Sequence, residues 1–303
     1  MIVVFGSINV DLVTTMARFP RSGETVVANH VSQAPGGKGA NQSLAARRAG
    51  AKVKLIGVVG TDHFAKLALS LVDEAGVDVS AIRVGDTQTG NATILVDENG
   101  NNAIAVVAGA NGSIDDLDVE RAFVNLNTAD VLLLQMEIPA TPMRKLIDRA
   151  REKGVTTILN LAPYTDDAIT LAPLADILIL NEHEFTDLSV GLGLKGADLN
   201  DLLQSAHVHL QRTLVVTLGE RGVIAKHGNQ IYRAAGLPVS PVDTIGAGDT
   251  FCGYFAASLE AGNDFQTALD RAAAAGSLAC LETGGQSGIP AIDDVLRAIG
   301  VAA

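Results

Sequence analysis

The sequence predicts a three-layer α/β/α main domain that carries a small β-sheet lid. Short apolar segments alternate with helical patterns through most of the 303 residues, which is typical of a parallel sheet covered by helices on both faces. The apolar segments lack polar alternation, as expected of strands that are buried on both sides. Two stretches break this alternation with strand patterns that have no helix between them, and they give the lid.

The expected strands of the main sheet are short runs rich in β-branched residues and leucine. They lie at residues 2–5, 53–59, 131–135, 156–159, 177–180 and 214–218. Helical patterns at 41–49, 62–75 and 142–153 each end at a glycine, namely Gly50, Gly76 and Gly154. A glycine just past a helix adopts the left-handed conformation that ends it. Further helices are expected at 248–259, 265–281 and 293–299.

The lid strands are expected at 11–15 with 24–33, and at 91–96 with 102–107. Asn99 and Gly100, between the second pair of strands, form a hairpin signal. Neither pair of strands has room for a core of its own. The chain, 1–303, is therefore predicted to be a single α/β domain with a discontinuous lid from about 10–35 and 88–110.

Composition argues against several classes of protein. The chain has 22 Lys and Arg against 34 Asp and Glu, a net charge of −12, whereas a nucleic-acid partner needs cations for its phosphates. The longest apolar runs fall far short of the roughly 20 residues that cross a bilayer, and the N-terminus lacks the basic region of a signal peptide.

Cys252 and Cys280 are too few for a disulfide framework and are expected to be small buried side chains. We expect a cytoplasmic protein with no nucleic-acid or membrane partner.

Polar residues follow the predicted strands and are expected to form a row at one rim of the sheet. Ligands of open α/β sheets bind outside the carboxyl ends of the strands. The residues that follow successive strands are Ser7, Asn9 and Asp11, then Glu137, then Asn181 and Glu184, then Gly219 and Gly222.

Two glycine-rich segments do not fit the known phosphate loops. Segment 34–41 contains Gly-Lys, as a P-loop does. However, a P-loop has Ser or Thr at the position of Gly39 and its first Gly at the position of Ser32. Segment 246–251 begins like a dinucleotide fingerprint, but Phe251 replaces its last glycine. A P-loop and a nicotinamide site are therefore excluded.

Segment 243–251 nevertheless predicts an anion site, because a glycine-rich turn leads into an apolar helix. The free backbone N–H groups and the helix dipole at such a start favour an anion. Asp249 would lie in the first turn, beside a transferring phosphoryl group, as a base that activates a hydroxyl. The alternative is that Asp249 or Thr250 merely caps the helix.

Segments 36–42 (GGKGANQ) and 243–251 (DTIGAGDTF) together resemble the signatures of the ribokinase family of carbohydrate kinases. Segment 6–11 (GSINVD), Glu137 in QMEIP, the pair Asn181 and Glu184, and Thr217 with the glycines after it match in the same order. The resemblance spans nearly the whole chain. It implies a ribokinase-like fold and a transferase that moves phosphate from ATP to the primary hydroxyl of a small sugar, above all the 5-hydroxyl of D-ribose, giving ribose 5-phosphate.

The resemblance also implies a role for each matched residue. The sugar would be held by Asn9, Asp11, Gly37, Lys38, Asn41 and Glu137, with Asp249 as the catalytic base. The anion hole would be formed by Gly246, Ala247 and Gly248. Mg²⁺ and the phosphates of ATP would be bound by Asn181 and Glu184, the latter through water. The rest of the ATP site would be lined by Thr217, Gly219 and Gly222.

A monovalent cation and a dimer follow from the same resemblance. K⁺ would be bound by Asp243 and Ile245, with Ala279 and Gly284 completing the site through their carbonyl groups, although Glu282 and Gly288 depart from the family pattern.

The dimer would form through the lids. The strand at 103–107 (AIAVV) is almost wholly apolar, and an unpaired edge strand invites pairing with a second chain. We expect Ala105 and Val107 in this homodimer interface. The alternative is that the strand packs on its own main domain.

Alternative functions remain within the family and outside it. A nucleoside kinase needs an aromatic platform for the base, but the lid segments contain only Phe19. A phosphosugar kinase needs cations there, and the lid segments offer only Arg18 and Arg21. A small neutral sugar is therefore favoured, with fructose and 2-deoxyribose still open. A non-catalytic sugar-binding regulator is the alternative of another class, and the intact Asp249 and its glycine turn argue against it.

Overall fold

An eight-stranded sheet forms the centre of the computed structural model, which describes residues 1–301. The strand order is β14-β13-β12-β11-β10-β9-β1-β4, and all pairs are parallel except those that involve β13 and β14. The strands are β1 (Ile2–Phe5), β4 (Val53–Ile56), β9 (Val131–Gln135), β10 (Thr156–Asn160), β11 (Ile177–Asn181), β12 (Thr213–Thr217), β13 (Val223–His227) and β14 (Gln230–Ala234). The predicted three-layer fold is confirmed.

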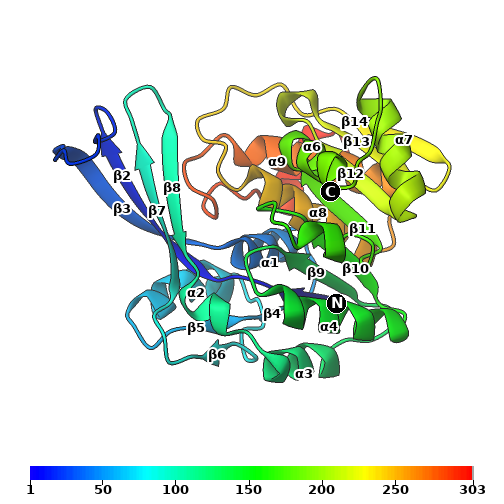
Figure 1. The fold of residues 1–303 in the computed structure, drawn as a ribbon, viewed down its shortest axis with the longest axis horizontal. Coiled ribbons are helices and arrows are strands. Elements are labelled where there is room, and N and C mark those ends of the chain that lie inside the picture. Colours follow the sequence, from blue (N-terminus) through cyan, green and yellow to red (C-terminus); the bar gives the residue numbers. More distant parts are fainter. Residues whose placement is uncertain (302–303) are drawn as a thin grey trace.

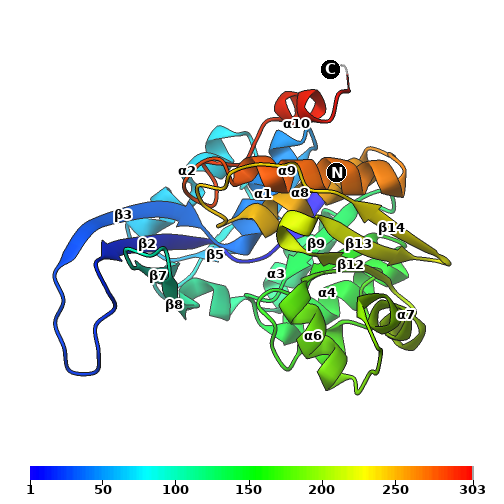
Figure 2. The same ribbon diagram turned by 90° about the horizontal axis from the view of Figure 1, so that it is seen from above.

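Helices cover both faces of this sheet (Figure 2). One face carries α1 (Lys38–Arg48), α2 (Phe64–Glu74), α8 (Ala247–Glu260) and α9 (Phe265–Ala279), with α10 (Ile292–Ala298) packed on α9. The other face carries α3 (Asp116–Val124), α4 (Ala140–Glu152), α5 (Ala168–Leu171), α6 (Glu182–Gly191) and α7 (Leu199–Leu210). Ile2 and Val4 belong to the first buried cluster and Val3 and Phe5 to the second. The strands are therefore buried on both sides, as their apolar sequences predict.

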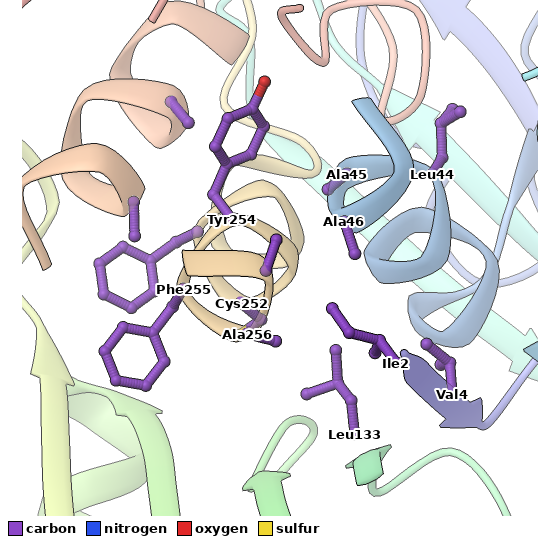
Figure 3. Close-up of a cluster of buried hydrophobic side chains, with 14 of the residues drawn as sticks. Ile2, Val4, Leu44, Ala45, Ala46, Leu133, Cys252, Tyr254, Phe255 and Ala256 are labelled. Atoms are coloured by element: carbon purple, nitrogen blue, oxygen red, sulfur yellow. The ribbon is translucent and has the colours of Figure 1, made fainter. Parts of the chain in front are cut away.

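Small residues allow α1 and α8 to lie unusually close together. A Cβ atom at Gly253 of α8 would be 2.5 Å from the Cβ of Ala45 on α1. Figure 3 shows Ala45 and Ala46 facing α8. Phe255 and Cys252 of α8 belong to the same buried cluster as Ile2 and Leu133 of the sheet. This contact fixes the start of α8 relative to the start of α1, where the predicted site residues lie.

The lid is a four-stranded sheet that extends away from the main body (Figure 1). Its order is β3-β2-β7-β8, formed by β2 (Asn9–Met16), β3 (Ala28–Gly36), β7 (Gly90–Val96) and β8 (Asn102–Val107). Asp11 is in register with Ala92, and Ala92 with Val106, so these three side chains share one face. Ala105 and Val107 therefore lie on the opposite face.

Every residue of β8 is exposed. The alternative that this strand packs on its own main domain is therefore wrong.

Several predicted boundaries are corrected. The strand expected at 53–59 breaks at Gly57, so β4 joins the main sheet while β5 (Val58–Val59) pairs with β6 (Arg83–Val84). A Cβ at Gly57 would lie 2.7 Å from the carbonyl oxygen of Gly6, so the chain passes too close there for a side chain. The second lid strand begins at Ala28, and β13 and β14, joined by Gly228 and Asn229, are strands that the sequence analysis missed.

Other expectations are confirmed or refined. Gly50, Gly76 and Gly154 have φ values of 97°, 78° and 71°, the left-handed conformation predicted after α1, α2 and α4. Cys252 is buried but Cys280 is only half-buried, and both thiols are free. Short 3₁₀ helices lie at Gly109–Ser113 and Gly219–Arg221. Within residues 1–301, no helix has the length and apolar character of a membrane span.

Candidate active site

The predicted polar residues lie at the carboxyl ends of the parallel strands. Gln135 ends β9 and is in register with Asn160, which ends β10. Asn181 ends β11 and is in register with Thr217, which ends β12. The lid is attached at the same edge, because β2 begins at Asn9 and β3 ends directly before α1. The expected row at one rim of the sheet is thus formed.

Asp249 is held by two amide groups rather than by the end of its own helix. The N-cap of α8 is Gly246, with φ of 78°. The Nδ2 of Asn41 donates to Asp249 Oδ2, and the Nε2 of Gln42 donates to Oδ1, both at 2.9 Å. Thr250 is not a cap either, since its buried hydroxyl has no hydrogen-bond partner in the part of the chain that the structure describes. The capping alternative is therefore wrong, and this buried carboxylate is held in a fixed orientation.

A network of buried amides supports the two groups that hold Asp249. The Nε2 of Gln135 donates to Gln42 Oε1 at 2.8 Å, and the Nε2 of Gln286 donates to Asn41 Oδ1 at 3.0 Å. Gln42 Nε2 is also 3.0 Å from Asn160 Oδ1. Sequence reasoning missed these residues. A buried polar residue at the end of an apolar strand was a signal for Gln135 and Asn160, whereas no local signal marks Gln286.

Glu137 and Asn9 are fixed by their own hydrogen bonds. Glu137 Oε2 accepts from Ser7 Oγ at 2.5 Å and from the backbone N–H of Lys38 at 3.1 Å. Asn9 Oδ1 accepts from Asn111 Nδ2 at 2.7 Å, and Asn111 was also missed. A cavity of about 360 Å³ borders Asn9, Asn111 and Glu137 and reaches Val106 of the lid. These polar side chains therefore border an open volume of small-molecule size.

Asp11 differs from its neighbours because its carboxylate accepts no hydrogen bond within residues 1–301. Burial raises its pKa to about 6, and the nearby Glu137 and Asp249 carboxylates add to this rise while Lys38 opposes it. The Asp249 carboxylate raises the pKa of Lys38 against the effect of burial. The site thus concentrates three acids around one ammonium group, which is typical of a site that awaits polar ligands.

The start of α8 offers backbone donors beside Asp249. The N–H of Ala247 is 3.3 Å from the carbonyl oxygen of Thr244, while no acceptor within residues 1–301 faces the N–H groups of Gly246 and Gly248. A Cβ at Gly248 would meet no atom within 4 Å, whereas one at Gly246 would lie 2.4 Å from the carbonyl oxygen of Gly285. Gly248 therefore borders open space, and Gly246 packs on the loop at 284–288.

The residues assigned to the nucleotide end already have structural contacts. Asn181 and Glu184 form a reciprocal capping box at the start of α6, with distances of 2.8 and 2.9 Å. Burial raises the pKa of Glu184. Thr217 Oγ1 donates to the carbonyl of Leu180 at 3.3 Å. Gly222 is explained by packing, since its Cβ would lie 2.1 Å from the carbonyl oxygen of Ala234, whereas Gly219 borders open space with φ of 60°.

The residues assigned to the monovalent cation lie in the segment before α8, at the end of α9 and in the loop after it. Asp243 accepts from the N–H groups of Ile245 and Gly284, both at 2.9 Å. Ala279 is buried, and its carbonyl oxygen receives no hydrogen bond within the described chain. A Cβ at Gly288 would lie 2.6 Å from that oxygen, which gives a physical reason for a glycine there.

Comparison with known proteins decides the family. A model described as pfkB family carbohydrate kinase matches residues 1–292. The chain belongs to the pfkB family of carbohydrate kinases.

Individual pfkB relatives cover almost the whole chain. The ribokinase of Bacillus subtilis is 36% identical over 97% of both chains, and the deoxyribokinase of Salmonella typhi is 31% identical over 96% of both. The solved structure of Arabidopsis thaliana ribokinase complexed with ribose and ATP aligns over 99% of both chains, with 30% identity and a TM-score of 0.87. The fold and the sugar-kinase activity that the two signature segments implied are confirmed.

Proposed function

We propose that this pfkB kinase transfers the γ-phosphoryl group of ATP to the 5-hydroxyl of D-ribose. The observation that carries this proposal is Asp249, a buried carboxylate with both oxygens held by amides, beside free backbone N–H groups at the start of α8. The names and coverage of the ribokinase relatives support ribose as the sugar.

Asp249 acts as the general base of the transfer. It accepts the proton of the sugar hydroxyl as the hydroxyl oxygen bonds to the γ-phosphorus and the bond from that phosphorus to the β–γ bridging oxygen breaks, releasing ADP. The N–H groups of Gly246, Ala247 and Gly248, together with the dipole of α8, stabilise charge on the transferring group. Phosphoryl transfer depends mainly on such positioning and charge stabilisation.

The sugar is held by Asn9, Asp11, Gly37, Lys38, Asn41 and Glu137. A sugar hydroxyl both donates and accepts, so it suits carboxylates that need donors and an ammonium that needs acceptors. Asp11 has no partner of its own within residues 1–301, so it is free to accept from a hydroxyl. Ala92 and Val106 share the lid face of Asp11 and would cover the carbon skeleton.

ATP lies toward Thr217, Gly219 and Gly222, with Asn181 and Glu184 at its phosphates. The residues fit a Mg²⁺ ion, since one carboxyl oxygen of Glu184 has no donor in the described chain and Mg²⁺ takes oxygen ligands while keeping several waters. Glu184 would hold such a water. Mg²⁺ held there would supply positive charge against the phosphates of ATP.

A potassium ion fits beside the start of α8. The carbonyl oxygen of buried Ala279, which receives no hydrogen bond within residues 1–301, and the carboxylate of Asp243 are the ligand types that such a cation needs. The carbonyls of Ile245 and Gly284 would complete the set. The bound cation supplies positive charge next to the backbone donors of the anion hole.

The lid and the assembly belong to the same proposal. The chain acts as one domain whose lid sheet covers the sugar, and two lids pair in a homodimer. The cytoplasmic location stays a prediction.

An ATP-consumption assay with a panel of sugars tests the function. D-ribose is expected to give the highest kcat/KM among ribose, 2-deoxyribose, fructose and a nucleoside, and NMR should place the phosphate on the 5-oxygen. Higher kcat/KM with 2-deoxyribose would assign the chain to the other named activity among its relatives. Sugar binding without ATP consumption would instead support the non-catalytic regulator.

A further inference from the structure

The two oxygens of Asp249 are held by consecutive residues of α1, and each of these residues is held in turn by a glutamine from a distant element. Gln286, from the loop before α10, donates to Asn41, and Gln135, from the end of β9, donates to Gln42. Gln42, Gln135 and Gln286 are at most 1% exposed. The carboxylate is thus reached by two chains of amides.

Each outer glutamine determines which way the inner amide faces. An asparagine side chain has a donor on one side and an acceptor on the other, so the two orientations are not equivalent. With Gln286 Nε2 on Asn41 Oδ1, Asn41 must present its NH₂ group to Asp249. The opposite orientation would place two donors face to face at Gln286 and an amide oxygen against the carboxylate.

Each outer glutamine is only half satisfied in its buried position. The Oε1 atoms of both Gln135 and Gln286 are buried and have no hydrogen-bond partner in the described chain. An unpaired buried acceptor costs free energy, and this cost offsets the stability that the Nε2 hydrogen bond of each glutamine contributes.

The loop that carries Gln286 is itself held in place. Its neighbour Gly285 packs against Gly246, the N-cap of α8, and the carbonyl of Gln286 accepts from Arg48 Nη1 at 3.1 Å. The glutamine side chain therefore projects from a backbone that is fixed relative to both α1 and α8.

We propose that Gln286 and Gln135 are positioning residues that fix the amide orientations of Asn41 and Gln42, and through them the orientation of Asp249. This inference rests on the proposed function, in which Asp249 is the base. Neither glutamine needs to touch the sugar or ATP.

The substitution Gln286→Met tests the inference, because methionine has a similar size and no amide. We expect kcat to fall about 10-fold, the loss expected for one hydrogen bond in a charged network. The midpoint of thermal unfolding should change little, because the substitution removes the unpaired Gln286 Oε1 but leaves Asn41 Oδ1 without its donor. Gln286→Glu should lower kcat further, since its carboxylate repels Asn41 Oδ1 and favours the inverted amide. Gln204→Met, on the exposed side of α7, is the matched control and should leave kcat unchanged.

A double-mutant cycle separates positioning from a purely structural role. If Gln286 acts through Asn41, then Gln286→Met should cause little further loss of kcat in an Asn41→Ala background. An equal loss in both backgrounds, or a loss that follows a lower unfolding midpoint, would overturn the inference. Gln135→Met provides the second test, with Gln42→Ala as its partner in the cycle.

The same assays distinguish the two proposals. An active wild-type enzyme with unchanged kcat in Gln286→Met and Gln135→Met overturns this inference alone. A wild-type chain that phosphorylates no sugar overturns the proposed function, and this inference with it.

Discussion

Two aspartates of the site, Asp11 and Asp249, differ in the hydrogen bonds that their carboxylates already accept. Asp249 is fixed by two amide donors, so it is ready to accept a proton from one direction. Asp11 has no donor within residues 1–301 and is surrounded by other acids, so it gains its hydrogen bonds only when a hydroxyl arrives. The first arrangement suits a base, and the second suits a binding group.

Replacing Asp249 by alanine should abolish turnover while sugar binding largely survives. The loss of a general base costs about 10²–10⁴-fold in kcat, because the sugar hydroxyl no longer has a proton acceptor. The sugar assay gives kcat and titration calorimetry gives the affinity for ribose, with Asp73→Ala on the surface of α2 as the control. If the variant kept more than about a tenth of the wild-type kcat, Asp249 would serve only to order Asn41 and Gln42.

Replacing Asp11 by asparagine should stabilise the fold while weakening sugar binding. The pKa of Asp11 rises from 3.8 to about 6 on folding, so the folded state binds more protons than the unfolded state between these values and loses stability as the pH rises through them. The neutral amide avoids that loss, which is on the order of 3 kcal/mol in the free energy of unfolding at neutral pH.

Urea unfolding of both proteins at neutral pH and at about pH 4 checks this expectation. The advantage of Asp11→Asn should shrink toward zero in acid, where the wild-type carboxyl is also protonated. A variant that is less stable than wild type at neutral pH would show that Asp11 has a stabilising partner.

At the scale of elements, the site depends on how closely helices and loops approach one another. Asn41 and Gln42 reach Asp249 because α1 and α8 meet at Gly253. The start of α8 is held from the other side, where Gly246 packs on Gly285. The catalytic geometry is therefore set by backbone contacts that only glycine permits.

Replacing Gly253 by alanine should damage both stability and catalysis. The new Cβ would lie 2.5 Å from Ala45 Cβ and 2.6 Å from the carbonyl oxygen of Gln42, so α1 must shift away from α8. Overpacking of this kind costs about 1–3 kcal/mol, which exceeds the gain of up to roughly 1 kcal/mol from alanine in a helix.

Thermal unfolding and the sugar assay measure the two effects of Gly253→Ala. Ser70→Ala, on the exposed side of α2, is the control. A lower unfolding midpoint with an unchanged kcat would mean that the pairing of Asn41 and Gln42 with Asp249 tolerates a helix shift.

Potassium should raise activity above that in sodium or Tris buffer. A cation between Asp243 and the carbonyl of Ala279 would order the segment that leads into the anion hole without touching the sugar. Rates are compared in the three buffers after carried-over K⁺ is removed, and Asp243→Ala should abolish the difference. Equal wild-type rates would mean that the departures at Glu282 and Gly288 have removed the activation.

At the scale of the whole molecule, the lid sheet stands out because one of its two edge strands is exposed. The four lid strands extend from the main body (Figure 1), and β8 is exposed along its entire length. Among residues 1–301, nothing covers the edge and the apolar outer face of β8, which is the arrangement that a lid-to-lid dimer would bury.

The wild-type protein should be a homodimer in light scattering at tens of micromolar. Ala105→Glu and Val107→Glu place a charge on the lid face opposite Asp11, so each should give a monomer with weakened ribose affinity. Val208→Glu, on the exposed side of α7, is the control. A wild-type monomer, or a dimer that survives both substitutions, would contradict the proposed interface.

The alternation of strands and helices, the lid, the family and Asp249 as the candidate base could all be predicted from the sequence. These features are local: apolar runs, terminal glycines and the segment at 243–251 carry their signal within a few residues. The hairpin of β13 and β14 also has a local turn signal at Gly228 and Asn229, although its strands were missed.

The groups that hold Asp249 could not be predicted in this way, because they come together only in the folded chain. Gln286 and Asn41 are 245 positions apart in the sequence, and nothing in either local segment indicates the other. The same applies to Asn111 beside Asn9 and to the outward face of Ala105 and Val107, which follows from strand register. Such contacts arise when packing brings distant backbones together, so their specificity belongs to the fold and not to any one segment.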